Sequence, residues 1–309
     1  MIGLDVGGAN LKVASEDGYE IIHFPIWKRL NELGNLLEKI RDRYDSESAC
    51  VVMTAEISDV FERKVEGVLR ISREVERVFR EVYYLDVNGE VRDRVDDPKR
   101  FMATNWIASC KFLLEEGYRN FVFVDVGSTT TDVIPVGDYV AGKTDLERLM
   151  DYELIYIGVL RTPTFHLTDL NVSTEFFSIT ADVFRVTGDI CEEDYNCETP
   201  DGRGKSYREC LNRIARLFCS DLEELNEEFL INFAKSVRNR FLDVLKFAIL
   251  RQKLKGFNTV LGCGMGEFLI REAVRDLKME YVSIEERFGF SKVFPAYATL
   301  MICKRFLGR

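Results

Sequence analysis

The spacing of hydrophobic residues changes repeatedly along the chain, from short apolar runs to patterns with a helical period. Short apolar runs are typical of strands, and apolar residues three and four positions apart are typical of a helix. The pattern predicts strands at residues 2–6, 11–14, 20–24, 50–53 and 82–87. It predicts helices at residues 28–44, 62–79 and 98–114, the last of which begins at Pro98 and ends before Gly117.

The pattern of the first strands returns after Gly117. Residues 121–126 form an apolar run that ends in Asp-Val-Gly, and residues 131–136 form a return strand. Later strands are predicted at 154–156 and 259–261, and later helices at 207–218, at 222–253, from residue 267, and at 296–306. Strands that first form hairpins and then alternate with helices indicate an α/β fold with a mixed sheet in each of two related halves.

Length and charge narrow the class of protein. The chain has 309 residues, and 42 Lys and Arg against 52 Asp and Glu give a net charge of −10. An acidic chain suits neither nucleic acid nor an anionic membrane surface, and no apolar run approaches the roughly 18 residues of a membrane span. Asp5 interrupts the stretch that would have to be apolar in a signal peptide. We expect a cytoplasmic protein with small-molecule partners, and the oligomeric state stays open.

Four of the eight cysteines lie close together in the sequence. They are Cys191, Cys197, Cys210 and Cys219. A four-thiolate metal site has to be weighed, but the spacings lack the close pairs of zinc sites, so small buried thiols are preferred. The two histidines, His23 and His166, each stand alone, which favours packing or a polar contact.

The first stretch with candidate chemistry is I-G-L-D-V-G-G-A-N-L-K, residues 2–12. The strand carries Asp5 to its end, and Gly7-Gly8 allows a tight turn that can hold a phosphate. Asp5 near such an anion makes sense only with Mg²⁺ or a proton between them, and Mg²⁺ takes one or two carboxylates together with phosphate oxygens. An ordinary hairpin with a surface aspartate is the alternative for this stretch taken alone.

The second stretch, residues 121–136, repeats this design. Asp125 corresponds to Asp5, and Gly127 is followed by three hydroxyl side chains that can donate to phosphate oxygens. They belong to Ser128, Thr129 and Thr130. Asp132 follows in the return strand. Two such loops together favour a metal and phosphate site over two unrelated hairpins.

The third stretch lies between a predicted strand and a predicted helix. Gly262, Gly264 and Gly266 alternate there and allow close approach of the backbone to a ligand at a helix N-terminus. A dinucleotide-binding fold is disfavoured, because the acidic residue that it needs after a second strand is not evident.

These three stretches, in this order, resemble the acetate/sugar kinase, heat-shock chaperone and actin superfamily. Narrower motifs resemble its hydantoinase/oxoprolinase-related branch, tied to archaeal tetrahydromethanopterin-linked one-carbon metabolism. They are G-L-D-V-G-G-A-N-L-K, M-T-A-E-I-S-D-V-F (53–61), V-D-V-G-S-T-T-T-D-V-I-P-V, G-V-L-R-T-P (158–163) and T-P-D-G-R-G-K-S (199–206). The resemblance implies two ribonuclease-H-like domains with mixed sheets around a central cleft. We expect them at residues 1–105 plus 293–309 and at residues 106–292.

The resemblance further implies an Mg²⁺-dependent alkyl transferase of methanofuran biosynthesis. Such an enzyme joins a furanylmethyl diphosphate to the phenol of γ-glutamyltyramine and releases pyrophosphate. It makes Asp5 and Asp125 the Mg²⁺ ligands, and Gly7, Gly8, Ser128 and Thr129 phosphate-loop positions. ATP-using relatives usually carry Ser or Thr after the first glycines, whereas Ala9-Asn10 stands here, with Asn10 as a binding candidate.

Other site residues are drawn from the chemistry that this reaction needs. A phenol with a pKa of about 10 gains from a nearby base, and Asp132, Glu56 and Asp182 are candidates. Anion contacts for diphosphate or for a glutamyl carboxylate are candidates at Lys12, Arg161, Arg203 and Lys205. For each of these four, a solvated surface charge stays an equal alternative.

Two other functions stay open. An ATP-dependent small-molecule kinase or hydantoinase-like enzyme of the same fold would bind nucleotide at residues 262–266. An actin- or chaperone-like nucleotide switch, which is not an enzyme, would use the fold for assembly or partner release. We expect no further substrate-binding domain after residue 309, which favours the enzyme.

Overall fold

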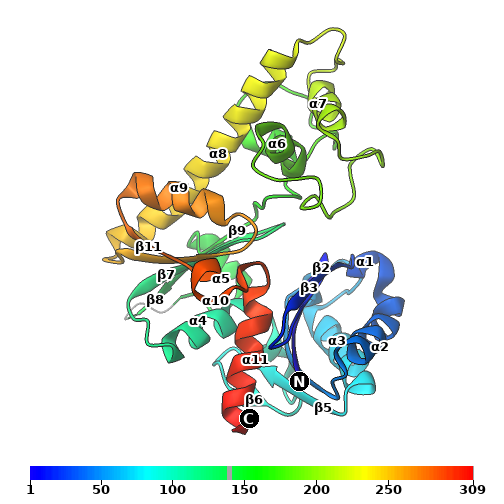
Figure 1. The fold of residues 1–309 in the computed structure, drawn as a ribbon, viewed down its shortest axis with the longest axis vertical. Helices are drawn as coiled ribbons and strands as arrows, with labels where there is room; N and C mark the ends of the chain where they lie inside the picture. The colour runs from blue at the N-terminus through cyan, green and yellow to red at the C-terminus, as the bar shows by residue number, and fades with distance from the viewer. Residues whose placement is uncertain (138–140, 309) are drawn as a thin grey trace. The chain divides into compact units, whose positions relative to one another are not determined.

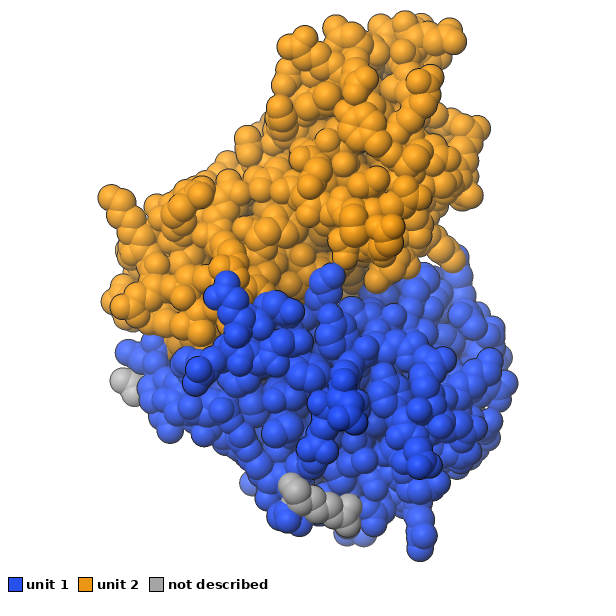
Figure 2. Space-filling view, in the orientation of Figure 1, with its two compact units in different colours: residues 1–120, 136–150, 284–309 blue, residues 121–135, 151–283 orange. Residues whose placement is uncertain are grey.

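The computed structural model describes residues 1–137 and 141–308. The chain divides into two compact units, coloured separately in Figure 2. Unit 1 comprises Met1–Asn120, Val136–Met150 and Ile284–Arg309, and unit 2 comprises Phe121–Pro135 and Asp151–Ser283. The α/β class with a mixed sheet in each half is confirmed.

Unit 1 contains a six-stranded sheet in the order β3-β2-β1-β4-β5-β6. Its strands are β1 (Ile2–Val6), β2 (Asn10–Ala14), β3 (Tyr19–His23), β4 (Ser48–Met53), β5 (Glu81–Leu85) and β6 (Val91–Arg92). β1, β2 and β3 pair antiparallel, whereas β1, β4 and β5 run parallel. The predicted hairpin and the predicted central strands are therefore confirmed, and the short β6 was not predicted.

Helices pack against both faces of this sheet (Figure 1). The helices of unit 1 are α1 (Ile26–Arg29), α2 (Leu33–Tyr44), α3 (Lys64–Val78), α4 (Asn105–Glu115), α5 (Asp145–Met150), α10 (Ile284–Phe288) and α11 (Phe294–Leu307). Those that pack on the sheet include α2, α3, α4 and α11. Leu4 on β1 shares a core with Leu37 on α2 and Ile71 on α3. On the opposite face α11 lies so close that a Cβ at Gly3 would come 2.0 Å from the carbonyl oxygen of Ala296. Asp5 lies on that second face, two residues further along β1.

Two predicted helices of unit 1 are interrupted. The pattern at residues 28–44 continues through α1, a 3-10 turn at Leu30–Glu32 and α2, because the backbone changes conformation at Arg29. The pattern at residues 98–114 divides into a 3-10 turn at Pro98–Phe101 and α4. Ala103 between them has a φ of 50°, in the left-handed region, so a continuous helix is wrong here.

Unit 2 contains a five-stranded sheet in the order β11-β10-β7-β8-β9. Its strands are β7 (Phe121–Val126), β8 (Thr131–Val136), β9 (Leu154–Ile155), β10 (Thr259–Cys263) and β11 (Glu280–Ser283). β7, β10 and β11 run parallel, and β8 and β9 continue the sheet on the other side of β7. Read from β9 to β11, the third, second, first, fourth and fifth strands of this unit follow one another. The strands β3-β2-β1-β4-β5 of unit 1 have the same order, which confirms the two related halves.

A long connection between β9 and β10 carries most helices of unit 2 (Figure 1). The helices of unit 2 are α6 (Thr180–Thr187), α7 (Tyr207–Arg216), α8 (Glu227–Leu254) and α9 (Glu267–Leu277), with a 3-10 turn at Thr164–Leu167. The first three pack on one another, while α9 packs on β7 and β10. The predicted helix 222–253 begins later, because the Asn226 side chain accepts a hydrogen bond from the N–H of Phe229 and caps α8.

The compact units divide the chain at other positions than the predicted domains. α4 lies in unit 1, since it packs against α11, whereas the sequence predicts a first domain that stops at residue 105. The predicted domain limits, and the cleft between the domains, stay predictions. Within residues 1–137 and 141–308, no helix is long and apolar enough to span a bilayer.

Candidate functional site

The turn after β1 holds the first group of predicted site residues. Asp5 is 4% exposed, and the ammonium of Lys12, its cross-strand neighbour on β2, lies 3.7 Å from Asp5 Oδ2. The N–H of Gly7 donates to the carbonyl of Asn10 at 3.1 Å and closes a tight turn. A Cβ at Gly7 would come 2.8 Å from that oxygen, so this position needs glycine. Asn10 contacts His23 Nδ1 at 3.3 Å, the polar contact expected for His23.

Glu56 follows β4 in a 3-10 turn (Ala55–Ile57), in the segment that packs beside the Gly7-Gly8 turn. Its Oε1 accepts a hydrogen bond from the N–H of Ala103 at 3.0 Å, and no hydrogen bond is found for its buried Oε2 among the described residues. Burial raises the pKa of Glu56 to about 8, and nearby Asp145 adds to the rise. The carboxyl group of Glu56 is therefore mostly protonated at neutral pH.

In unit 2 the second and third predicted stretches pack against each other. Asp125 is the penultimate residue of β7, opposite Cys263 of β10, and is 7% exposed. Gly264 has a φ of 93°, and a Cβ there would come 2.3 Å from Asp125 Oδ1. The N–H of Gly266 donates to the carbonyl of Val126 at 2.9 Å. The glycine turn at 262–266 is thus part of the structure that surrounds the Asp125 carboxylate.

The hydroxyl loop after β7 is covered by the G-V-L-R-T-P motif, residues 158–163. Gly158 lies so close that a Cβ would come 2.4 Å from the backbone nitrogen of Thr129. Arg161 donates from its backbone to the carbonyl of Ser128 at 3.0 Å and from its guanidinium to Thr129 Oγ1 at 3.3 Å. Burial lowers the pKa of Arg161, against the influence of Cys197 and neighbouring groups. A cation therefore stands directly beside the predicted phosphate loop.

Gly127, Thr130 and Asp132 lie in or next to the hydroxyl loop, as predicted. The N–H of Gly127 donates to the carbonyl of Thr130 at 2.9 Å, which closes the turn as Gly7 does in unit 1. Asp132 is buried on β8, opposite Leu154 of β9. Asp132 therefore lies on the strand that returns from the hydroxyl loop.

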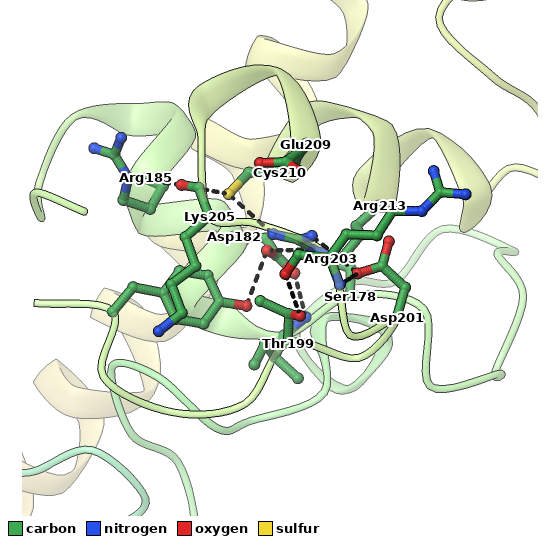
Figure 3. A network of polar contacts seen from close by, with 12 residues as sticks. Ser178, Asp182, Arg185, Thr199, Asp201, Arg203, Lys205, Glu209, Cys210 and Arg213 are labelled. Carbon is green, nitrogen blue, oxygen red and sulfur yellow. Dashed lines mark hydrogen bonds and ion pairs between the residues drawn. The ribbon is translucent and has the colours of Figure 1, made fainter. Parts of the chain in front are cut away.

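Asp182 is a candidate base from the sequence, but hydrogen bonds within the protein hold its carboxylate (Figure 3). Its Oδ2 accepts from the N–H of Ile179, and its Oδ1 accepts from Tyr195 and from Arg213 Nε at 3.1 and 2.8 Å. Both Asp182 and Arg213 are completely buried. Because both carboxylate oxygens are engaged, the geometry favours a role for Asp182 in holding the fold.

Arg213 links this pair to the T-P-D-G-R-G-K-S motif (Figure 3). Arg203 in the motif is exposed, and Lys205 is half-buried. The sequence did not single out Arg213, although the S-x-x-E pattern at Ser206–Glu209 marks the helix that carries it.

The four clustered cysteines divide into two kinds. Cys197 and Cys210 are buried as expected, whereas Cys191 and Cys219 are exposed, so buried packing is wrong for those two. Burial raises the pKa of the Cys197 thiol to about 11 and that of Cys210 to about 12. In the described part of the chain, no three His, Cys, Asp or Glu side chains are grouped to hold a metal ion.

The residues around Asp5 and Asp125 fit the coordination chemistry of Mg²⁺. The buried carboxylate of Asp5 lies beside the Gly7 turn and that of Asp125 beside Gly264, and neither glycine has room for a Cβ. Mg²⁺ usually takes one or two protein carboxylates and completes its shell with water and phosphate oxygens. A single carboxylate from each turn is thus a suitable donor set. That both bind one shared cation stays a prediction.

Comparison with solved structures supports the class of fold. Nucleotide-free acetone carboxylase, an enzyme of ATP-dependent acetone carboxylation, matches with a TM-score of 0.52 at 12% identity. The match covers 94% of this chain and 51% of the carboxylase chain. At this identity the match supports the predicted fold class, with two mixed sheets of actin-like type, and says nothing about activity.

The sequence comparisons are more specific. The profile of the hydantoinase/oxoprolinase family matches residues 47–302. A (4-{4-[2-(γ-L-glutamylamino)ethyl]phenoxymethyl}furan-2-yl)methanamine synthase of Methanocaldococcus jannaschii is 38% identical over all of this chain and 99% of its own length. A synthase of the same name from Methanococcus vannielii is 36% identical over 63% of this chain and 95% of its own length.

The chain therefore belongs to the (4-{4-[2-(γ-L-glutamylamino)ethyl]phenoxymethyl}furan-2-yl)methanamine synthase family, within the hydantoinase/oxoprolinase group. The expectation of an enzyme is confirmed, since the relatives are synthases.

Proposed function

We propose that this enzyme forms the aryl ether in the product for which its relatives are named. In the proposed reaction the phenol oxygen of γ-glutamyltyramine attacks the CH₂ of a furanylmethyl diphosphate. A new C–O bond forms there, the C–O bond to diphosphate breaks, and pyrophosphate leaves with the bonding electrons. The phenol proton passes to a base on the protein. The enzyme would act in the cytoplasm, in methanofuran biosynthesis.

The observation that carries this proposal is the repeated strand end in the two units. In each, a central strand ends in a buried aspartate next to a turn closed by a glycine N–H. Mg²⁺, held by Asp5 and Asp125, would neutralise the charge that develops on the leaving pyrophosphate. The name of the relatives adds that their product contains a phenoxymethyl-furan linkage.

The residues of the two turns would orient the diphosphate. Each turn has a cation beside it in its own unit: Lys12 lies beside Asp5, and Arg161 lies beside Thr129. Hydroxyls of Ser128 and Thr129 can donate to phosphate oxygens. Fixed donors of this kind do not have to reorganise as charge moves from carbon to the leaving group, which lowers the barrier.

Glu56 is the base that we assign to the phenol. Burial raises the pKa of Glu56 to about 8, closer to that of a phenol than an ordinary carboxylate would be. A base accepts a proton more efficiently when its pKa approaches that of the donor. Its Oε1 is held by the N–H of Ala103, so the side chain has a fixed orientation.

The test is to supply purified enzyme and Mg²⁺ with γ-glutamyltyramine and the furanylmethyl diphosphate, without ATP. We expect ether product and pyrophosphate in equal amounts, measured by mass spectrometry and a pyrophosphate assay. A parallel reaction contains ATP and furanylmethanol derivatives without diphosphate. Phosphate release from ATP there, with no ether in the first reaction, would overturn the proposal in favour of an ATP-dependent enzyme.

A further inference from the structure

The backbone around Lys205 is held by side chains from two helices. The carbonyl of Gly204 accepts from Arg213 at 3.0 Å, and the N–H of Gly204 donates to Glu209 at 3.0 Å. The carbonyl of Lys205 accepts from Arg185 Nε at 3.4 Å and is 3.7 Å from the thiol of Cys210. Arg185 belongs to α6 and the others to α7. Two consecutive peptide groups of this loop are thus held by side chains.

Arg213 is the centre of this arrangement (Figure 3). Its guanidinium donates to Asp182 at 2.8 Å, to Asp201 at 3.1 Å and to the carbonyl of Gly204, so one buried side chain ties α6, α7 and the loop together. A buried ion pair contributes little net stability compared with apolar packing, but it can impose one arrangement on the groups around it. Here the arrangement that it imposes is the course of residues 201–204.

The side chain of Lys205 packs on an aromatic ring. Its ammonium lies 5.4 Å from the centre of the Tyr195 ring, and the Tyr195 hydroxyl is itself bound to Asp182. Among residues 1–137 and 141–308, no carboxylate forms an ion pair with Lys205. A half-buried ammonium on an aromatic ring, without an ion pair to a carboxylate of the described residues, is suited to a carboxylate supplied by a ligand.

We propose that Lys205 binds the α-carboxylate of the γ-glutamyl group of the acceptor, and that Arg213 is the residue that positions the loop for it. The proposal rests on the proposed function, which already places the diphosphate at the turns after β1 and β7. The γ-glutamyl group is the other anionic part of the reactants, and the relatives' name shows that it stays in the product. Lys205 lies in the long β9–β10 connection, in the same unit as the turn after β7.

The test uses γ-glutamylethylamide, which has the glutamyl group but no phenol and cannot react. We expect the wild-type enzyme to bind it in a calorimeter and to be inhibited competitively against γ-glutamyltyramine. Lys205→Met should weaken binding about 10- to 100-fold, the effect of losing one charge-assisted hydrogen bond. Lys205→Arg keeps the cation and should retain most of the affinity. Arg213→Lys should weaken binding as well, by loosening the loop.

The controls separate this inference from a general loss of activity. Lys235→Met removes an exposed lysine from α8 and should leave binding of γ-glutamylethylamide unchanged. Lys205→Met should raise KM for γ-glutamyltyramine and leave kcat and the binding of Mg²⁺-pyrophosphate nearly unaltered. Equal affinity of Lys205→Met and wild type for γ-glutamylethylamide, or no binding by the wild type, overturns the inference even if ether is formed. Failure to form ether overturns the proposed function, while the calorimetric result still reports on Lys205.

Discussion

Glu56 combines two properties at the scale of a single residue. It is 1% exposed, and its burial keeps the pKa of its carboxyl near 8. The folded protein therefore holds a proton at Glu56 that the unfolded chain releases above a pKa of about 4.5. Because the folded state binds the additional proton, the contribution of Glu56 to the free energy of unfolding falls as pH rises from about 4.5 to about 8.

Glu56→Gln should therefore stabilise the protein while it impairs catalysis. The amide keeps the acceptor for Ala103 and removes the loss of stability between these pH values. We expect the difference in Tm between variant and wild type to grow from pH 5 to pH 8 in thermal denaturation. The exposed Glu228→Gln serves as a control with no such trend. A variant with unchanged pH dependence would show that Glu56 is ionised in the folded state.

The pH dependence of the wild-type rate should reflect the ionisation of Glu56. If Glu56 accepts the phenol proton, kcat/KM rises with pH until about 8, where the carboxyl becomes ionised. Glu56→Gln should lower kcat and remove this limb of the pH profile. A profile that stays flat between pH 6 and 9 would assign the proton transfer to another group, with Asp132 as the next candidate.

Replacing Asp125 by asparagine tests the role of its negative charge without changing the shape of the side chain. Asp125→Asn preserves the size of the side chain beside Gly264 but removes the negative charge proposed to hold Mg²⁺. We expect kcat to fall by at least about 100-fold, the scale of losing one group that stabilises the transition state, with a nearly unchanged Tm. Asp169→Asn, at an exposed position of the same unit, is the matched control. A large drop in Tm for Asp125→Asn would give Asp125 a structural role instead.

At the scale of elements, the sequence predicted what depends on local patterns and missed what depends on distant contacts. β1, β7 and β8 could be predicted because they are short, mainly apolar runs, as buried strands are, and their turns because glycines mark them. The helix predicted over residues 98–114 is wrong because Ala103 adopts a left-handed conformation while it donates to Glu56, 47 residues away. Periodicity contains no information about such a contact.

The same division holds for the candidate site. Asp5, Asp125 and the hydroxyl loop were visible because each lies within a few residues of a glycine turn. The pairing of Asp182 with Arg213 joins residues 31 positions apart, so no local pattern reveals it. The burial of Glu56 was also invisible, since it depends on α3: a Cβ at Gly67 would come 2.6 Å from the Glu56 backbone.

The turn before α9 offers a test at this scale. Gly264→Ala forces a residue with φ near 93° and pushes a methyl group against Asp125, so it should lower both stability and kcat. Gly188→Ala has a similar φ of 80° at the end of α6 but nothing within 4 Å of the added Cβ. It should cost about 1–2 kcal/mol of stability from backbone strain alone, without a change in kcat. Chemical denaturation and steady-state rates of both variants make the comparison; equal kcat values would separate Gly264 from the Asp125 site.

At the scale of the whole molecule, both units are built on the same order of strands, and each carries one proposed Mg²⁺ ligand. A ligand that binds the folded chain but not the unfolded one raises stability by mass action. Mg²⁺ with pyrophosphate at about 100 times its Kd should add about 2.7 kcal/mol, seen as a rise of several degrees in Tm. Pyrophosphate with a chelator should give little of this rise, and so should Asp125→Asn with both ligands. An equal rise with and without the metal would argue against Mg²⁺.

The β9–β10 connection, with its own ion pair and helix caps, has a consequence for how such enzymes diversify. Mutations between residues 188 and 258 can accumulate without altering the strands that carry Asp5 and Asp125 or the motif at 158–163 beside the hydroxyl loop. A lineage could thus exchange one nucleophilic partner for another and keep its machinery for expelling pyrophosphate. Chimeras that swap this segment between distant homologues should inherit acceptor preference from the donor of the segment.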